Sequence, residues 1–227
     1  MRLLFLFCAF ASFASAKIPS ALSDALAAFR AEGAPGWSYR QTTVAGGKSL
    51  VERYNPALPE FERWSLLEKD GRPTTPDEQR DYREKQTRRS RGGTAPRITD
   101  SLDLTTVELI SETPEQAVYR CRLKKTETGD STAEFLRATL VLHTPTQTIE
   151  QFELSNTAPF SPALTIKIAE MKTVMSFSRP TPDRPSVLLG VTTRLRGRAF
   201  YFKSLDEDMA VTCSEHTKAS SRRSIDR

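Results

Sequence analysis

The chain has 227 residues, of which 38% are hydrophobic and 27% are charged, and its formal net charge is +5 at pH 7. This length is enough for one domain with a substantial buried core. The positive excess is small and spread along the chain, which favours solubility and argues against nucleic acid as a partner.

The first sixteen residues have the three parts of a signal peptide. Arg2 is a positive n-region, residues 3–13 form an apolar run, and Ala14-Ser15-Ala16 is a small-x-small cleavage site. The run is shorter than the roughly 20 residues that span a bilayer, and no later segment is apolar enough to do so. We therefore predict a mature chain that begins at Lys17 and is not transmembrane. Cleavage removes one arginine and no acid, so the net charge falls to +4. The signal peptide predicts a location in the periplasm, with secretion as the alternative.

An amphipathic helix is predicted from Ser20 to Glu32. Ser20 is a suitable N-cap, and Gly33 follows as a stop. The apolar residues fall at helical spacing on one side, and they are Leu22, Ala25, Leu26 and Phe29. We expect this helix to cover an apolar sheet face, because a single helix at the start of a β-rich chain must bury its apolar side against the sheet.

Three strands are predicted after this helix, because apolar and polar residues alternate there between turn signals. They lie at residues 37–44, 48–56 and 60–71. The hairpin signals between them, such as Gly46-Gly47, predict antiparallel pairing of neighbours.

A charged helix is predicted next, at residues 77–90. Thr75 as the N-cap, a proline at the first helical position and Glu78 three residues after the cap predict where it begins. Tyr82 is its only large ring, so we expect an exposed helix or one that forms only part of the time. It belongs to an insertion at 72–98 that ends in a flexible basic linker.

Seven more strands are predicted in the rest of the chain. They lie at residues 102–111, 116–126, 133–144, 147–156, 163–179, 186–205 and 209–216. The alternation loses phase near Glu170, which predicts a bulge, and the sixth segment is expected to bend near Gly197. We predict a mainly β fold, a curved antiparallel meander sheet (half-barrel) packed around the N-terminal helix, with the charged helix inserted. A single domain spans 17–216, and residues 217–227 form a disordered tail.

Several short motifs accompany this order of elements. The first predicted strand is aromatic, with Trp37 and Tyr39, the second ends in Tyr54-Asn55-Pro56, and the third contains Arg63-Trp64. In these features the chain resembles the LolA/LolB-like half-barrel superfamily, which includes periplasmic lipoprotein carriers and RseB-type sensor domains. The stretches ERYNP…ERWSLLEKDGRPTTPDEQRDYREK and LRGRAFYFKSLDEDMAVTCS are more similar still to a group of uncharacterised bacterial exported proteins. In the carriers, the resemblance implies an apolar concave face that holds acyl chains.

Few residues suit catalysis or metal binding. The two histidines, His143 and His216, do not stand in a spacing typical of a catalytic triad or a metal site, and His143 is expected to be exposed at a strand end. We therefore predict a protein that is not an enzyme, with no catalytic residue, no metal and no cofactor. Cys121 and Cys213 lie in predicted strands of an exported chain, and the sequence leaves open whether they form a disulfide or remain buried thiols.

Apolar side chains in the predicted strands are candidates for lining a ligand site on the concave face. They are Trp37, Trp64, Phe152, Met171, Met175, Phe177, Phe200 and Phe202. A curved sheet under one helix exposes more apolar area than the helix covers, and methionines adapt to a flexible chain. We therefore expect an apolar ligand, a lipid or a lipidated peptide, to bind there.

The basic residues of the insertion are candidates for a contact with an anionic partner. They are Arg80, Arg83, Arg88, Arg89 and Arg91. An anionic membrane surface or an acidic envelope protein would suit them. The alternative function is therefore an interaction module of the cell envelope with a filled core, and a third hypothesis is a hydrolase with His143 as its base.

Overall fold

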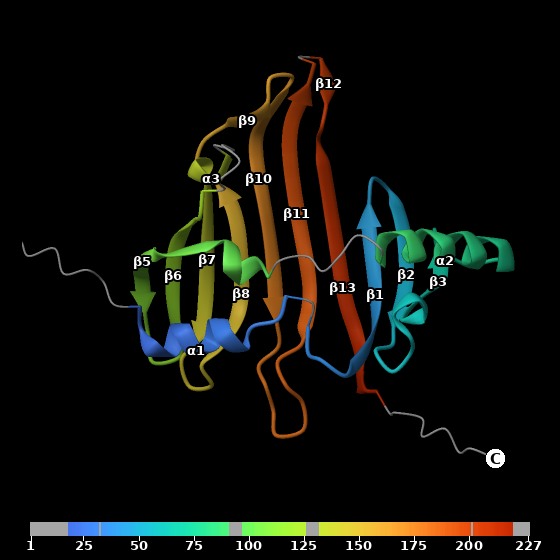
Figure 1. The fold of residues 1–227 in the computed structure, drawn as a ribbon, viewed down its shortest axis with the longest axis horizontal. Coiled ribbons are helices and arrows are strands. Elements are labelled where there is room, and N and C mark those ends of the chain that lie inside the picture. The colour runs from blue at the N-terminus through green and yellow to red at the C-terminus, as the bar shows by residue number, and fades with distance from the viewer. Residues whose placement is uncertain (1–17, 32, 91–96, 126–131, 201, 220–227) are drawn as a thin grey trace, which may run out of the picture.

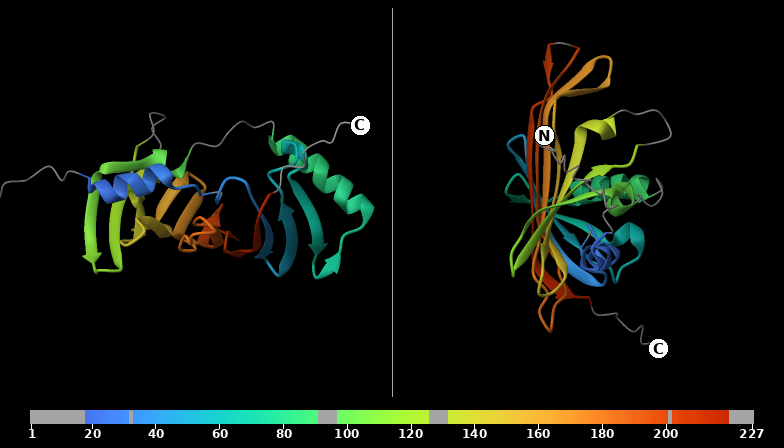
Figure 2. Two further views of the ribbon diagram at one scale, coloured as in Figure 1. Left: turned by 90° about the horizontal axis from the view of Figure 1, so that it is seen from below. Right: turned by 90° about the vertical axis from the view of Figure 1, so that its left-hand side faces the viewer.

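The computed structural model describes residues 18–31, 33–90, 97–125, 132–200 and 202–219. Within these ranges, a 13-stranded antiparallel sheet forms the body of the protein, and it is open and curved (Figure 1, Figure 2). The strand order is β4-β3-β2-β1-β13-β11-β10-β8-β7-β6-β5, with β9 paired to β10 and β12 paired to β11. The predicted fold class, a mainly β curved sheet with an N-terminal helix, is confirmed.

The elements follow the predicted order closely. The helices are α1 (Ser20–Ala28), α2 (Pro76–Ser90) and α3 (Thr132–Phe135), and the 3-10 turns are η1 (Glu60–Glu62) and η2 (Ile98–Ser101). The first strands are β1 (Trp37–Ala45), β2 (Lys48–Tyr54), β3 (Trp64–Lys69) and β4 (Arg72–Pro73). The middle strands are β5 (Leu102–Glu112), β6 (Gln116–Leu123), β7 (Leu136–His143), β8 (Thr148–Asn156) and β9 (Phe160–Ala163). The last strands are β10 (Ile166–Phe177), β11 (Leu188–Ala199), β12 (Lys203–Ser204) and β13 (Glu207–Lys218).

Two meanders lie side by side in the sheet. Strands β1–β4 form one and β5–β13 form the other, and β1 joins them by pairing with β13. The chain passes from the edge strand β4 to the opposite edge strand β5 through α2 and the residues after it (Figure 1). The expected start of the tail at residue 217 is too early, because Lys218 of β13 still pairs with Trp37 of β1. Residues 220–227 lie outside the described chain.

Helix α1 covers one half of a sheet face, which we call the helix face because α2 lies on the same side (Figure 2). Leu22 is fully buried there, and the ring of Phe29 lies with its centroid 6.2 Å from that of Phe152 and 5.0 Å from that of Phe177. Leu140 of β7 is also fully buried in this cluster. Each such side chain contributes about 1.5–3 kcal/mol when it leaves water. Under α1, therefore, the helix face is filled by the protein's own side chains.

Helix α2 covers the other end of the helix face. The Tyr82 hydroxyl donates to the Glu52 carboxylate over 2.5 Å, and Gln41 Nε2 donates to the other carboxylate oxygen over 3.0 Å. Glu52 is only 9% exposed. The sequence predicts an exposed helix here, and most of its side chains are indeed exposed, but a buried polar contact anchors it to β2.

A projecting tip is the third feature of the sheet. The register of β10 shifts between Ile168 and Glu170, which confirms the predicted irregularity. Gly197 lies at this point in β11, where a Cβ would come within 2.7 Å of the Lys167 carbonyl oxygen, so a side chain does not fit. Beyond it, β10 and β11 extend past the rest of the sheet together with β9 and β12 (Figure 1). We call the described residues 160–169, 196–200 and 202–206 the tip.

Both cysteines of the described chain are free, buried thiols. Cys121 is in β6 and Cys213 is in β13, five strand spacings away in the sheet order. At about 4.8 Å for each spacing, they are separated by about 24 Å along the sheet. A disulfide needs Cα atoms within about 7 Å, so the alternative of a bridge between them is ruled out in this fold.

Candidate functional site

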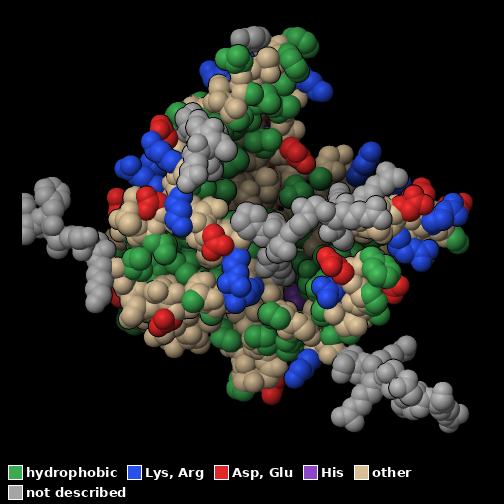
Figure 3. Space-filling model, viewed as in Figure 1, with side chains coloured by type: hydrophobic (Ala, Val, Ile, Leu, Met, Phe, Trp, Pro, Cys, Tyr) green, Lys and Arg blue, Asp and Glu red, His purple; other side chains and the backbone are tan. Residues whose placement is uncertain are grey.

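Helices α1 and α2 cover the two ends of the helix face, and the described surface between them is hollowed in its upper middle (Figure 3). Met175 packs at the edge of the cluster under α1, and Met171 packs against a second, smaller cluster toward the tip. Between them, the hydroxyls of Thr173 and Thr193 share a hydrogen bond of 3.2 Å. The two methionines predicted as ligand lining therefore flank a mixed apolar and hydroxyl surface.

A pocket of about 280 Å³ opens at the C-terminal end of α1, and we call it the α1 pocket. The end of α1, the turn between β7 and β8, and the loop between β10 and β11 supply its walls. Its lining residues are mostly apolar, and they include Ala25, Ala28, Phe29, Ile149, Phe177, Pro180 and Pro185. Phe177 is the one predicted ligand residue among them. Phe152, in contrast, is 1% exposed and is a core residue.

Arg30 is the charged residue in the described lining of the α1 pocket. Its Nη1 atom donates to the carbonyl oxygens of Ala27 and Phe29, at 2.9 and 2.7 Å. These carbonyls are unpaired acceptors at the end of a helix, and a cation is favourable there because of the helix dipole. The pocket is therefore apolar inside, with a positive charge fixed at its rim.

A second arginine, Arg184, lies in the loop between β10 and β11, whose residues on either side line the α1 pocket. Its backbone exchanges two hydrogen bonds with Thr181, which fixes the loop. Its Nε atom is buried without a hydrogen-bond partner, and no acid of the described chain comes within ion-pair distance. The residue as a whole is only partly buried, so its charge keeps contact with water although the Nε atom does not. Arg184 is therefore a partly exposed cation beside the α1 pocket that no acid of the described chain neutralises.

His216 lies next to this arginine. Its Nε2 atom donates to the carbonyl oxygen of Leu188 over 3.0 Å, and Leu188 lies beside Gly33 of the pocket lining, where an added Cβ would come within 3.7 Å of the Leu188 Cβ. Burial lowers the pKa of His216, the hydrogen bond to Leu188 opposes this, and the nearby charge of Arg184 lowers it again. The neutral form is therefore favoured, and Arg184 remains the positive group on this side.

An aromatic cluster continues from His216 toward α2. The centroid of the Tyr39 ring lies 5.8 Å from those of His216 and Trp64, and 5.2 Å from that of Tyr54. Trp64, a predicted ligand residue, also lines a groove of about 480 Å³ between α2 and η1, with Leu58, Phe61, Tyr82 and Arg83. Trp37, also predicted, is half-buried at the start of β1, opposite Lys218.

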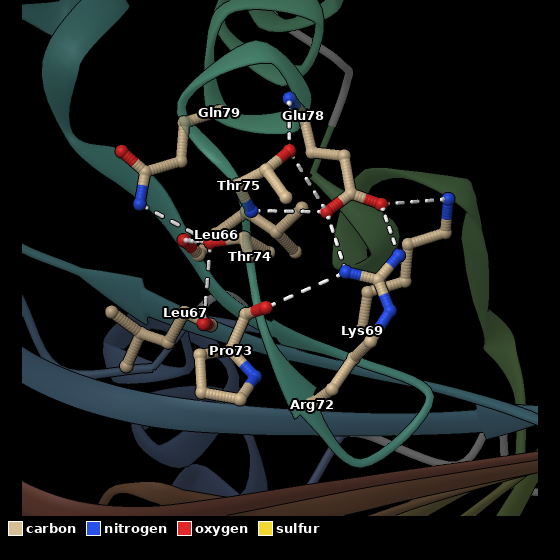
Figure 4. A network of polar contacts seen from close by, with 9 residues as sticks. All are labelled: Leu66, Leu67, Lys69, Arg72, Pro73, Thr74, Thr75, Glu78 and Gln79. Atoms are coloured by element: carbon tan, nitrogen blue, oxygen red, sulfur yellow. Dashed lines mark hydrogen bonds and ion pairs between the residues drawn. The ribbon is translucent and has the colours of Figure 1, made fainter.

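The start of α2 is held by a network of charged and polar groups (Figure 4). Thr75 and Glu78 form the predicted capping box, in which the Glu78 amide donates to Thr75 Oγ1 over 3.3 Å and the Thr75 amide donates to the Glu78 carboxylate over 3.0 Å. The Arg72 guanidinium donates two hydrogen bonds to the same carboxylate, at 2.7 and 2.9 Å. Lys69 lies 3.4 Å away. The bond from Arg72, then that from Thr75, lower the pKa of Glu78 to about 2.

The predicted basic contact is only partly described. Arg80 forms an ion pair of 2.9 Å with Asp77, and Arg83 lines the groove beside α2. Arg88 and Arg89 belong to the last turn of α2, but their side chains lie outside the described residues, as does Arg91 entirely.

Two predicted ligand residues are in a different place from the one expected. Phe200 and Phe202 are 57% and 86% exposed, in the turn between β11 and β12 at the tip. The sequence predicts a strand here because the apolar run continues through this turn, and a period of two does not mark where pairing stops. They do not line the helix face.

His143 also differs from expectation, because it is 5% exposed rather than at the surface. Its Nδ1 atom lies 2.7 Å from the hydroxyl of Thr146, and its Nε2 atom lies 3.5 Å from the Glu115 carboxylate. These partners belong to the turns at the ends of β6 and β7, so the contacts tie two turns together. The prediction of an exposed histidine was wrong because the turn folds back over the strand end.

Sequence reasoning missed three residues, Arg30, Arg184 and Leu164. Arg30 lies in the last turn of the predicted helix, where a basic residue is a known C-terminal signal. Arg184 has no local signal beyond its place among prolines, because its lack of a partner depends on the tertiary fold. Leu164 falls inside the predicted strand at 163–179, whereas it lies in the turn between β9 and β10, so the alternation gave no signal that it is exposed.

Comparisons with known proteins give no match, whether with models of protein families, with curated proteins or with solved structures. The resemblance to the LolA/LolB-like superfamily therefore stays a prediction. In the described part of the chain, no helix has the length and apolar character of a membrane span. The same residues hold no group of three or more histidine, cysteine or acidic side chains arranged for a metal ion.

Proposed function

We propose that the protein works outside the cytoplasm and binds, without catalysis, a ligand that has one apolar chain and an anionic head. The observation that carries the proposal is the open α1 pocket, which is apolar inside and has arginines beside it. This pocket lies at the edge of the cluster under α1, which is otherwise filled by the protein's own side chains. A fatty acid, an anionic lipid or a lipidated peptide has the required chemistry.

The volume of the α1 pocket sets the size of the apolar part. At about 280 Å³ the pocket lies near the lower end of the range for small-molecule pockets, which suits one medium-length acyl chain. Two full acyl chains of a phospholipid do not fit, so we expect a single chain to enter.

The charge around the α1 pocket sets the nature of the head. Its described lining contains Arg30 and no acid, and Arg184 stands in the adjoining loop with no counter-ion among the described residues. A carboxylate or phosphate at the mouth would complete the hydrogen bonds of a guanidinium, which prefers such planar or oxygen-rich anions. An uncharged head would leave the arginine unpaired.

Substitutions in the pocket test this function with matched controls. Ala28 and Ala27 are neighbouring exposed residues of α1, but only Ala28 lines the pocket. In titrations with decanoate, we expect Ala28→Trp to weaken binding at least about tenfold, because the ring fills the cavity, and Ala27→Trp to leave it unchanged. Arg184→Gln should weaken decanoate about tenfold and leave decanol unchanged.

Protein purified from the periplasm provides the first measurement. Native mass spectrometry with lipid extraction, on protein purified without detergent, is expected to show a co-purifying amphipathic anion in the wild type and not in Ala28→Trp. Absence of any bound species, together with no binding of decanoate or decanol, would sink the proposal. Equal decanoate binding by both tryptophan variants would show that the ligand binds outside the α1 pocket.

A second candidate function is docking of an envelope protein beside α2. The specific observation is the groove of about 480 Å³, where the exposed side chains of Leu58 and Phe61 lie near Arg83. An acidic peptide with an apolar side chain would match this surface. Cross-linking from a photoreactive group at position 58, in the periplasm, is the test, and a defined partner that is lost with Arg83→Glu is the expected result.

A further inference from the structure

Two turns lie next to each other at the end of the tip (Figure 1). Leu164 and Thr165 connect β9 to β10, where Ile166 pairs with Ala163. Phe200 and Phe202 belong to the turn between β11 and β12. The Phe200 amide donates to the Thr165 carbonyl oxygen over 2.7 Å, so the two turns are bonded to one another. Tyr201 lies outside the described residues.

The large apolar side chains of these turns face water. Leu164 is 98% exposed, Phe202 is 86% exposed and Phe200 is 57% exposed. These three are the most exposed large apolar residues of the described chain, and they lie on two adjacent turns rather than being scattered. Single exposed apolar residues are ordinary, but a cluster at a projecting end is typical of a contact surface.

Phe200 also has an unfavourable backbone conformation. Its φ is +50°, in the left-handed region where glycine or asparagine is preferred and a bulky side chain is an outlier. The sequence thus places an aromatic ring at an exposed position where glycine would suit the turn better. Strain of this kind is found where a side chain serves a contact rather than stability.

Basic residues surround the apolar turns. The segments 163–169 and 196–206 contain four basic residues and one acid, a net charge of +3. Arg196 is paired with Asp208 at 2.6 Å, whereas Lys167, Arg198 and Lys203 have no acid within ion-pair distance in the described chain. Figure 3 shows this arrangement, with apolar side chains at the end and basic ones on both flanks.

A shallow groove lies at the base of the tip. It has a volume of about 720 Å³, and its lining includes Lys167, Arg196, Arg198 and Phe202. Asp206 is the one acid of the lining, and its Oδ1 atom accepts a hydrogen bond from the Gly197 amide over 3.1 Å. This carboxylate is therefore already hydrogen-bonded to the backbone. Unpaired cations in a groove beside exposed rings suit phosphate groups that lie at the border of an apolar phase.

We propose that the tip docks on a membrane surface that contains anionic lipids. Leu164, Phe200 and Phe202 enter the interface between headgroups and acyl chains, and the flanking lysines and arginines contact the lipid phosphates. Apolar burial and attraction to anionic lipids together give stable but reversible binding, as in other proteins that lie on a membrane. The contact is separate from the α1 pocket and does not depend on the function proposed for it.

Vesicle co-sedimentation tests the docking. The probe is protein purified from the periplasm, with its N-terminus fixed by mass spectrometry, and vesicles of phosphatidylcholine with or without phosphatidylglycerol. The wild type is expected to sediment with the phosphatidylglycerol vesicles. The double variant Leu164→Ser with Phe202→Ser should lose at least about tenfold in affinity. Leu109→Ser with Ile110→Ser, which removes two exposed apolar side chains of β5 far from the tip, is the matched control and should bind like the wild type.

Charge variants test the second half of the proposal. Each of Lys167→Gln and Arg198→Gln should lower binding about fivefold on phosphatidylglycerol vesicles and leave binding to pure phosphatidylcholine unchanged. Added salt should weaken the wild type in the same way. No vesicle binding by the wild type, or binding lost in the control and kept in the tip variant, overturns the proposal. A dimer in light scattering that the tip variant alone abolishes, without vesicle binding, also overturns it in favour of a second copy of the chain.

Discussion

Replacement of Phe200 by glycine separates the contribution of the ring to stability from its proposed role at a membrane. The residue has φ of +50° and is 57% exposed, so less than half of its ring area is in contact with the protein. If the ring exists for an external contact, removing it should leave the fold intact while weakening the contact. If the ring instead holds the two turns of the tip together, stability should fall.

The expected change in the free energy of unfolding is the sum of three effects. Relief of the left-handed conformation stabilises the variant by about 1–2 kcal/mol. The greater freedom of glycine in the unfolded chain destabilises it by about 0.5–1 kcal/mol. Loss of the partly buried ring removes about 1 kcal/mol, less than half of the value for a fully buried phenylalanine. These effects nearly cancel, so we expect a change within about 1 kcal/mol of zero.

Thermal unfolding followed by circular dichroism measures this balance. A change of 1 kcal/mol shifts Tm by about 2–4 °C in a domain of this size, so Tm of Phe200→Gly should stay within that range of the wild type. Phe200→Ala is the matched control, because it loses the ring and keeps the strain, and it should be less stable than Phe200→Gly. A glycine variant less stable than the alanine variant would refute the reasoning, since the ring would then be a structural contact. Unchanged vesicle binding by Phe200→Gly would contradict the membrane role of the ring.

Three further predictions concern α2 and the thiols. Tyr82→Phe removes a hydrogen bond to the buried Glu52 carboxylate, and such a bond to a charged group contributes about 1.5–3 kcal/mol. Hydrogen exchange of the α2 amides should therefore become about tenfold faster or more, whereas exchange of the α1 amides should not change. The pKa of Glu78 is about 2 in the fold against an ordinary 4.5, so the ionised carboxylate stabilises α2 fully above pH 4.5 and this stabilisation is lost as the pH falls toward 2. Hydrogen-exchange rates, corrected for the intrinsic pH dependence of exchange, should therefore show that α2 opens before the rest of the fold as the pH is lowered. Corrected rates for α2 that do not change with pH would contradict this prediction. Burial raises the pKa of Cys121 and Cys213 to about 11, so both thiols should react with Ellman's reagent at pH 8 only after unfolding, and two fewer thiols in denaturant would reveal a disulfide instead.

Local features of this fold follow from the sequence because local physics determines them. The apolar spacing of α1 predicts which residues it buries, and Leu22 and Phe29 are indeed in the core. The capping box of Thr75 and Glu78 predicts the first turn of α2 to the residue. Loss of alternation near Glu170 predicts the bulge in β10. Each of these depends on neighbours within a few positions in the chain.

Long-range features of the fold could not be predicted from the sequence. Pairing of β1 with β13 joins residues about 180 positions apart, and alternation gives the face of a strand without naming its neighbour. The same limit explains Phe200 and Phe202, which look like strand residues but lie in a turn. Arg184 is ordinary in the sequence and becomes exceptional only because no described acid reaches it in the fold.

The α1 pocket and the tip lie at opposite ends of the same strands. The loop that lines the pocket follows β10 at Phe177, whereas the tip begins where β10 starts, at Ile166. Twelve extended residues span about 40 Å, so a membrane that touches the tip does not reach the pocket mouth. Docking and ligand binding should therefore vary independently. We expect Leu164→Ser with Phe202→Ser to keep the decanoate affinity of the wild type in solution, and Ala28→Trp to keep its vesicle binding. Loss of both activities in either variant, with Tm unchanged, would show instead that the two ends are coupled.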